Sequence, residues 1–197
     1  MKKKGLITVI IIVVVILAIY AWIKGSYNGM VQRQESVEAQ WAQVENVYQR
    51  RADLIPNLVA TVKGYAEHEE STLTAVIEAR AKATSITIDP TNIEPDDLAK
   101  FQAAQDELSG ALSRLLVSVE QYPDLKANEN FLALQSQLEG SENRITVERQ
   151  KFNEAARNYN QYIRMFPRNI IANMFDFEKV GYFKAQAGAE TAPKVEF

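Results

Sequence analysis

The feature that most constrains the fold of this sequence is a helical periodicity that runs from about Tyr27 to Lys82. Apolar and aromatic residues recur every seven positions, and a second row follows four residues behind the first. The first row comprises Met30, Val37, Val44, Leu58 and Tyr65, and the second comprises Trp41, Tyr48, Ile55, Val62 and Val76. This spacing is typical of one long helix that packs against other helices. The rows are interrupted at Gln34, Arg51, Glu69 and Thr72, which favours a bundle over a free two-stranded coiled coil.

Pro56 lies inside this predicted helix. Proline removes one backbone hydrogen bond and clashes with the carbonyl four residues earlier. Because the apolar rows continue from Ile55 to Leu58 across the proline, we expect a kink and not a break. A bend that lets the helix follow its partners is the simpler interpretation, and a binding site for a partner protein is the alternative.

An apolar run from Leu6 to Ile23 precedes the periodic region. At about 1.5 Å per residue, the run is just long enough to cross the roughly 30 Å hydrocarbon core of a bilayer. Tyr20 and Trp22 stand where an interfacial aromatic belt is expected. A cleaved signal peptide is the alternative, but its apolar core usually has about 7–15 residues. We therefore predict an uncleaved, single-pass transmembrane signal-anchor over residues 1–24.

Basic residues on either side of the run predict its orientation. Lys2–Lys4 precede it, whereas Lys24 and Arg33 follow it, so the sequence favours a cytoplasmic N-terminus and an extracytoplasmic bundle. Residues 25–29 contain two glycines and are expected to form a short hinge. The heptad rows start directly after this segment, which favours a helix that is nearly continuous with the anchor.

Two further long helices are predicted. A loop over residues 84–93 contains the turn signal Asp89-Pro90, and the second helix then runs to about Gln121. The third helix runs over about residues 127–165, and Gly140 within it predicts a close helix crossing. Its apolar row is unbroken at seven-residue spacing: Phe131, Leu138, Ile145, Phe152, Tyr159 and Phe166.

The end of the chain completes the predicted domain. A short helix over about residues 169–175 is expected to cover one end of the bundle, with further aromatic contacts from Phe177, Tyr182 and Phe183. Residues 184–197 are rich in alanine, glycine and charge, which predicts a disordered tail.

The predicted fold class is therefore all-α. A transmembrane helix is followed by an elongated antiparallel bundle over residues 30–183, built from three long helices and a short C-terminal helix, much as in a four-helix bundle. The first helix would be about 84 Å long and would extend beyond the others. Part of it is expected to form a stalk or to pair with copies of itself.

Several motifs together resemble the LemA family. They are Tyr27–Val31 (YNGMV), Arg50–Val59 (RRADLIPNLV), Val62–Glu69 (VKGYAEHE), Tyr122–Phe131 (YPDLKANENF), Glu139–Ile145 (EGSENRI), Phe152-Asn153 through Tyr159-Asn160, Phe166-Pro167 and Asn169–Ala172 (NIIA). The resemblance covers essentially residues 1–183. It implies a bacterial membrane-anchored protein with an N-terminal span and an α-helical bundle, from a family without an established enzymatic activity.

Composition excludes several kinds of site. The chain has no cysteine and one histidine, His68, so thiolate chemistry, a histidine-rich metal site and a Ser-His-Asp triad are disfavoured. The net charge of −3 is not that of a nucleic-acid-binding protein. Consecutive helical residues point about 100° apart, so Glu67–Glu70 do not converge on one metal ion and are interpreted as a solvated face. No catalytic, cofactor-binding or metal-binding residue is predicted.

Two polar groups accompany the third helix. A charged patch beside its apolar row is interpreted as solvated surface: Glu139, Glu142, Arg144, Glu148 and Arg149. Six asparagines near the row are expected to form hydrogen bonds between helices and to set their register, with a partner-binding strip as the alternative: Asn128, Asn130, Asn143, Asn153, Asn158 and Asn160.

These observations favour a non-enzymatic structural or scaffold protein of the bacterial cell envelope. It would be anchored by Leu6–Ile23 and would act through helix–helix contacts, with copies of itself or with other membrane proteins. The alternative is a monomeric accessory or receptor-like binding subunit of another membrane protein complex. Neither hypothesis includes a cofactor, a nucleic acid or a small-molecule substrate.

Overall fold

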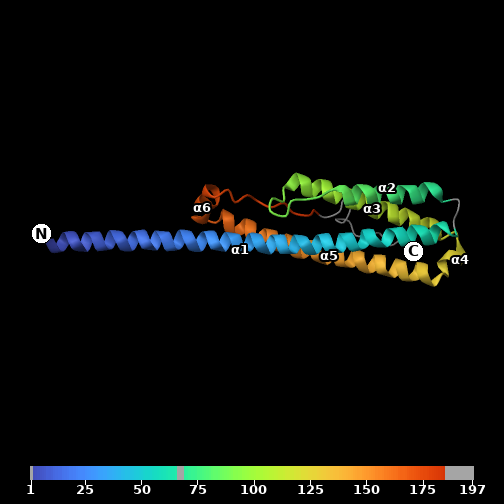
Figure 1. Cartoon of the computed structure of the whole chain (residues 1–197), viewed down its shortest axis with the longest axis horizontal. Coiled ribbons are helices and arrows are strands. Elements are labelled where there is room, and N and C mark those ends of the chain that lie inside the picture. Colours follow the sequence, from blue (N-terminus) through green and yellow to red (C-terminus); the bar gives the residue numbers. More distant parts are fainter. Residues whose placement is uncertain (1, 66–68, 185–197) are drawn as a thin grey trace, which may run out of the picture.

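The computed structural model describes residues 2–65 and 69–184, and within this part of the chain all regular secondary structure is helical. The protein is therefore all-α, as predicted. The helices are α1 (Lys2–Lys63), α2 (Glu70–Ser85), α3 (Pro95–Val119), α4 (Pro123–Lys126), α5 (Glu129–Arg164) and α6 (Arg168–Met174). Figure 1 shows an elongated bundle from which the N-terminal part of α1 projects alone.

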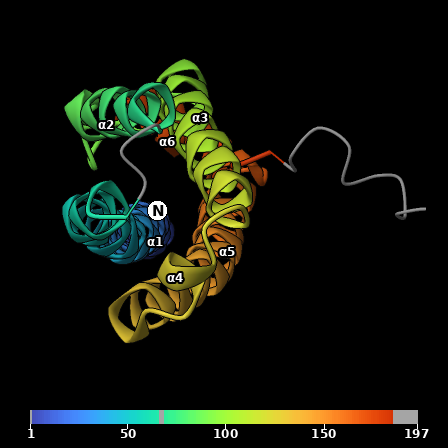
Figure 2. The same ribbon diagram turned by 90° about the vertical axis from the view of Figure 1, so that its right-hand side faces the viewer.

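Four long helices form the bundle, and each runs antiparallel to the next along the chain (Figure 1). α1 packs mainly against α5, and α2 packs mainly against α3, while α1 and α2 are also in contact. The end-on view in Figure 2 shows these helices side by side along the bundle axis. α4 turns the chain at the end distant from the N-terminus, and α6 packs on α1 and α5 at the opposite end.

The prediction of one helix from Tyr27 to Lys82 is wrong. α1 ends at Lys63, Gly64 and Tyr65 form a turn, and α2 begins at Glu70. The turn lets the apolar side of α2 fold back into the core instead of continuing past the end of α5. A heptad pattern does not distinguish these two arrangements, because its apolar rows are buried against other helices in both.

This turn also removes the need for a stalk outside the membrane. The part of α1 that follows Ile23 matches the 36 residues of α5 in length, and its apolar rows are buried from Met30 to Val62. The expectation that part of helix one must project or pair with copies of itself is therefore wrong for this region. Within residues 2–65 and 69–184, the N-terminal apolar run is the part that extends beyond the bundle (Figure 1).

That run is long and apolar enough to cross a membrane, with a mean hydropathy of 3.1 and no buried residues. α1 continues as a helix through residues 25–29, where a hinge was predicted, and through Pro56, where no break was expected. Packing explains the continuity at the first site, because Ser26 is buried and a Cβ atom on Gly29 would clash with the hydroxyl of Tyr162. Gly29 therefore serves close packing.

The close crossing predicted at Gly140 is also wrong. α5 passes through this position without interruption, and a Cβ atom there would meet no atom within 4 Å. The predicted second, third and short C-terminal helices correspond to α3, α5 and α6. Asn128 caps α5, since its side chain accepts a hydrogen bond from the amide of Phe131.

The core is divided into two apolar clusters along the bundle. The cluster nearer the N-terminal run is centred on aromatic contacts, in which Trp41 packs edge-on against Phe101 and Phe152 with ring centroids 5.3 and 5.6 Å apart. The distant cluster is mostly aliphatic and includes Leu58, Val76 and Leu115. A polar layer lies between the two clusters.

Candidate functional site

Arg51 lies at the centre of this polar layer. It extends from α1, its side chain is only 2% exposed, and it interrupts the apolar row between Val44 and Leu58. A buried guanidinium is costly unless its donors find acceptors. Arg51 meets this requirement with acceptors from two other helices.

Gln105 and Ser109 on α3 and Glu142 on α5 supply the acceptors. Arg51 Nη1 donates to Glu142 Oε2 and to Ser109 Oγ, each at 2.8 Å. Its Nη2 donates to Gln105 Oε1 at 2.6 Å and to the Gln105 carbonyl at 3.3 Å. Gln105 Nε2 donates in turn to the Ala83 carbonyl of α2 at 3.2 Å. One network therefore joins all four long helices.

Glu142 was interpreted from sequence as solvated surface, and that interpretation is only partly correct. Its side chain is 46% exposed, but its carboxylate forms an ion pair with the buried Arg51. The two residues are 91 positions apart in the sequence. No local pattern reports such a pair, since it depends on how α1 and α5 are rotated and staggered.

The network lacks the parts of a catalytic centre. Arg51 directs both terminal nitrogens to protein acceptors, although its Nε has no partner in the described structure. Arginine stays protonated, so it does not act as a general base at ordinary pH. The arrangement can position helices, and we assign it that structural role.

No group of three or more potential metal ligands occurs in residues 2–65 and 69–184. Of the predicted solvated face, Glu67 and His68 lie outside the described residues. Glu69 accepts hydrogen bonds from the hydroxyls of Tyr122 and Thr72, each at 3.2 Å. These contacts connect α2 to the turn before α4.

Within the described residues, no asparagine of α5 itself forms the predicted side-chain hydrogen bond to another helix, although Asn128, which precedes α5, donates to the hydroxyl of Tyr65 in the turn after α1 at 2.9 Å. Instead, two α5 asparagines hold the C-terminal segment, residues 176–184. Asn160 donates to the Val180 carbonyl at 2.8 Å and accepts from the Val180 amide at 2.9 Å. Asn153 makes the same pair of hydrogen bonds with Phe183, each at 2.9 Å.

Gln102 of α3 repeats this two-bond arrangement with the backbone of Lys184. The segment is thus held by side-chain amides from two helices. As a result, Phe183 is buried against Trp41, with stacked rings 6.2 Å apart. Tyr182 is 45% exposed, and its hydroxyl accepts a hydrogen bond from Asn160 at 2.9 Å. Of the predicted disordered tail, Lys184 is ordered by these contacts, and residues 185–197 lie outside the described residues.

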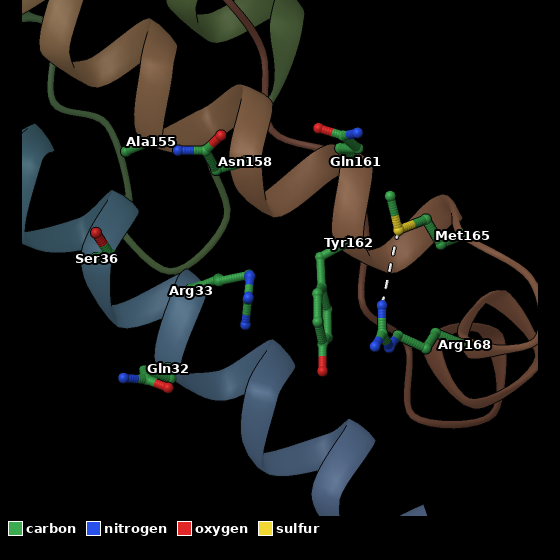
Figure 3. A pocket seen from close by; sticks show the side chains of 9 residues that line it. All are labelled: Gln32, Arg33, Ser36, Ala155, Asn158, Gln161, Tyr162, Met165 and Arg168. Carbon is green, nitrogen blue, oxygen red and sulfur yellow. Dashed lines mark hydrogen bonds between the residues drawn. The ribbon is translucent and has the colours of Figure 1, made fainter.

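A polar groove lies between α1 and α5 near α6 (Figure 3). Tyr162 separates the guanidinium groups of Arg33 and Arg168, whose central carbons lie 3.8 and 4.2 Å from the ring centroid. Such stacking favours a cation over the face of an aromatic ring. Within the described residues, neither arginine has a carboxylate within salt-bridge distance.

Two tyrosines of the bundle core have strongly perturbed acidity. Burial raises the pKa of Tyr48 to about 12 despite the nearby positive charges of Arg149 and Arg51. Burial also raises the pKa of Tyr159 to about 12, with a smaller contribution from Glu178. Both phenols therefore stay neutral at physiological pH and belong to the core.

Comparisons with known proteins agree with this architecture. The model of the LemA family matches residues 40–197. Protein LemA of Metamycoplasma hominis is 27% identical over 161 residues, which cover 82% of this chain and 70% of that protein. Magnetosome protein MamQ 2 of Paramagnetospirillum magneticum is 26% identical over 199 residues, covering 92% and 73% of the two chains. Magnetosome protein MamQ of Magnetospirillum gryphiswaldense is 26% identical over 182 residues, covering 84% and 67%.

Proposed function

Because the chain belongs to the LemA family and its first helix is long and apolar enough to cross a membrane, we propose that it is a non-enzymatic, membrane-anchored structural protein of the bacterial cell envelope. It acts through helix–helix contacts and assembles with copies of itself. The magnetosome relatives MamQ 2 and MamQ support association with a bacterial membrane.

The observation that carries this proposal is an apolar surface at the end of the bundle distant from the N-terminus. Val117 of α3 is 71% exposed and Leu132 of α5 is 50% exposed. They border a groove that also includes Leu116 and Phe131. These side chains form a small apolar surface at the rim of the groove, to which a helix of a second copy can bind. The apolar rows of α1 are buried within the chain, so this outer groove is the better surface for assembly.

The length of α1 sets the distance between the groove and the apolar run. From Ile23 to Lys63, α1 extends about 60 Å at 1.5 Å per residue. A helix anchored at Leu6–Ile23 would hold the groove at that distance from the membrane. Copies anchored in one membrane would then present their grooves at the same height.

Light scattering of the full-length protein in nanodiscs or detergent tests self-assembly. We expect a homo-oligomer, and we expect Val117→Glu with Leu132→Glu to reduce it to a monomer. The matched control is Val147→Glu, an exposed valine elsewhere on α5, which should leave the mass unchanged. A monomeric wild-type protein would contradict self-assembly and favour a monomeric accessory subunit whose groove binds another membrane protein.

We also propose that the bundle lies outside the cytoplasm, which the three lysines before the apolar run support. Because the chain has no cysteine, a single Phe197→Cys substitution provides a unique label. It should react with an impermeant thiol reagent in intact cells. Reaction only after lysis would mean that the bundle lies in the cytoplasm.

A further inference from the structure

α6 exposes one apolar side to solvent. Ile170 is 52% exposed and Met174 65%, and these two residues are spaced four apart within the helix, while Phe166, in the turn before α6, is 81% exposed. The other side of α6 is buried through Ile171 and Ala172, which pack in the core cluster. α6 is therefore an amphipathic helix whose apolar surface is only half covered by the bundle.

The position of α6 along α1 is the second observation. Phe175, directly after α6, packs edge-on against Tyr27 with ring centroids 5.0 Å apart. Tyr27 is four residues beyond Ile23, a rise of about 6 Å. The polar region on each side of a bilayer is about 5–7 Å thick, given the 30 Å core and the 40–45 Å total. Phe175 therefore lies at headgroup height if Leu6–Ile23 fills the hydrocarbon core.

Packing of the last apolar residue supports the same height. Ile23 is partly buried against the core cluster that includes Ile171 and Ala172. The bundle thus reaches the end of the apolar run with no intervening stalk (Figure 1). Trp22 and Tyr27 are 41% and 38% exposed at this level, where aromatic side chains favour the membrane interface.

Charge at this end is compatible with lipid headgroups. Lys24 and Arg164 are exposed, and Arg168 opens α6. Guanidinium groups bind phosphate well. The charge is mixed, because Asp176 directly follows Phe175 at the end of α6 that lies at headgroup height, and Glu178 follows it. The apolar side chains and the basic groups are the two features by which amphipathic helices bind membrane surfaces.

We propose that α6 is a second membrane contact, which lies in the headgroup layer and inserts Ile170 and Met174 toward the acyl chains. This inference rests on the proposed membrane anchor. The two contacts together would hold the bundle at a defined angle to the membrane, since a single span leaves rotation and tilt free.

Site-directed spin labelling of the full-length protein tests this contact. Single cysteines are introduced by Ile170→Cys and Met174→Cys, with Ile12→Cys as a label in the span and Val117→Cys as a label at the distant end. The protein is reconstituted in nanodiscs of phosphatidylethanolamine and phosphatidylglycerol. Collision rates with oxygen and with a water-soluble nickel chelate report the depth of each label.

We expect the depths of the labels at 170 and 174 to be closer to the depth of the Ile12 label than to that of the aqueous Val117 label. Adding Ile170→Glu to the Met174→Cys protein should return that label to water. An aqueous label at both 170 and 174 beside a buried Ile12 label overturns this inference and leaves the anchor intact. An aqueous Ile12 label overturns the anchor itself and the inference with it.

Discussion

Arg51 is the residue on which the packing of the four long helices depends most directly. Its guanidinium is buried, and its acceptors come from α3 and α5. Removal of one partner of a buried pair leaves an uncompensated charge, while apolar replacement of both partners is often tolerated. Removing one partner of the pair should therefore destabilise the protein more than replacing both, and substitutions can measure the difference.

We predict that Glu142→Leu destabilises the protein by about 2–3 kcal/mol, below the roughly 3–5 kcal/mol of a fully buried pair because the Glu142 carboxylate is partly solvated. Arg51→Met combined with Glu142→Leu should recover most of this loss. Glu107→Leu, which removes the partner of Lys82 from an exposed pair, is the control and should change little. Denaturant unfolding followed by circular dichroism measures the differences. Equal losses for Glu142→Leu and Glu107→Leu would contradict the prediction.

The sequence could not reveal this pair, for a physical reason. Arg51 lies at a gap in an apolar row, and Glu142 lies in a charged run. The row predicts that Arg51 faces the core, but Glu142 alone fits a solvated position. Their contact depends on the axial stagger of two helices, which the pattern within one helix does not encode.

Among the structural elements, the C-terminal segment over residues 176–184 has an unusual attachment. Side-chain amides of Asn153 and Asn160 take the place of a neighbouring strand, since each donates to and accepts from one backbone residue. Phe183 then covers Trp41 in the core. The asparagines therefore couple the end of the chain to the aromatic cluster.

We predict that Asn160→Asp releases this segment. A carboxylate keeps the acceptor for the Val180 amide but loses the donor to its carbonyl, and it places negative charge beside that oxygen. The loss of about 1–2 kcal/mol should speed amide exchange at Val180 and Phe183 about tenfold. Asn158→Asp, at an exposed position on the same helix, is the control. Unchanged exchange in Asn160→Asp by deuterium-exchange mass spectrometry would show that the segment is held by other contacts.

The sequence predicted most helices, and the main failure has an identifiable cause. The apolar rows before and after Lys63 have the same phase, so periodicity alone extends α1 to Lys82. Gly64 is the local signal for an end, since glycine commonly follows the last residue of a helix. Gly140 is also a glycine in a periodic helix, but α5 continues through it. Tertiary packing decides between these outcomes.

At the scale of the whole molecule, one uninterrupted helix belongs both to the apolar run and to the bundle. α1 spans Lys2–Lys63, and α5 covers its later part while α6 packs beside Tyr27. A force on the bundle would therefore reach the N-terminal run through a rigid helix. This continuity suits a protein that holds a contact surface at a set distance from a membrane.

Stability of the whole bundle should fall at high pH because of two buried tyrosines. Tyr48 and Tyr159 have pKa values raised from 10.0 to about 12, so the folded state keeps both phenols protonated when the unfolded state has lost those protons. Between about pH 10 and pH 12 the unfolded chain binds fewer protons, and the free energy of unfolding must decrease as the pH rises.

We expect the stabilisation by the two buried, protonated phenols to be fully present below pH 10 and to be lost through about pH 12. The loss in the free energy of unfolding is up to about 3 kcal/mol for each tyrosine. Tyr48→Phe combined with Tyr159→Phe removes both ionisations, so the decrease over this range should be much smaller. Denaturant unfolding of the full-length protein in detergent, repeated across the range, measures both slopes. The two proteins share every other ionisable group, so the difference between their slopes reports the two phenols. Parallel pH dependences would mean that burial of these phenols does not control alkaline unfolding.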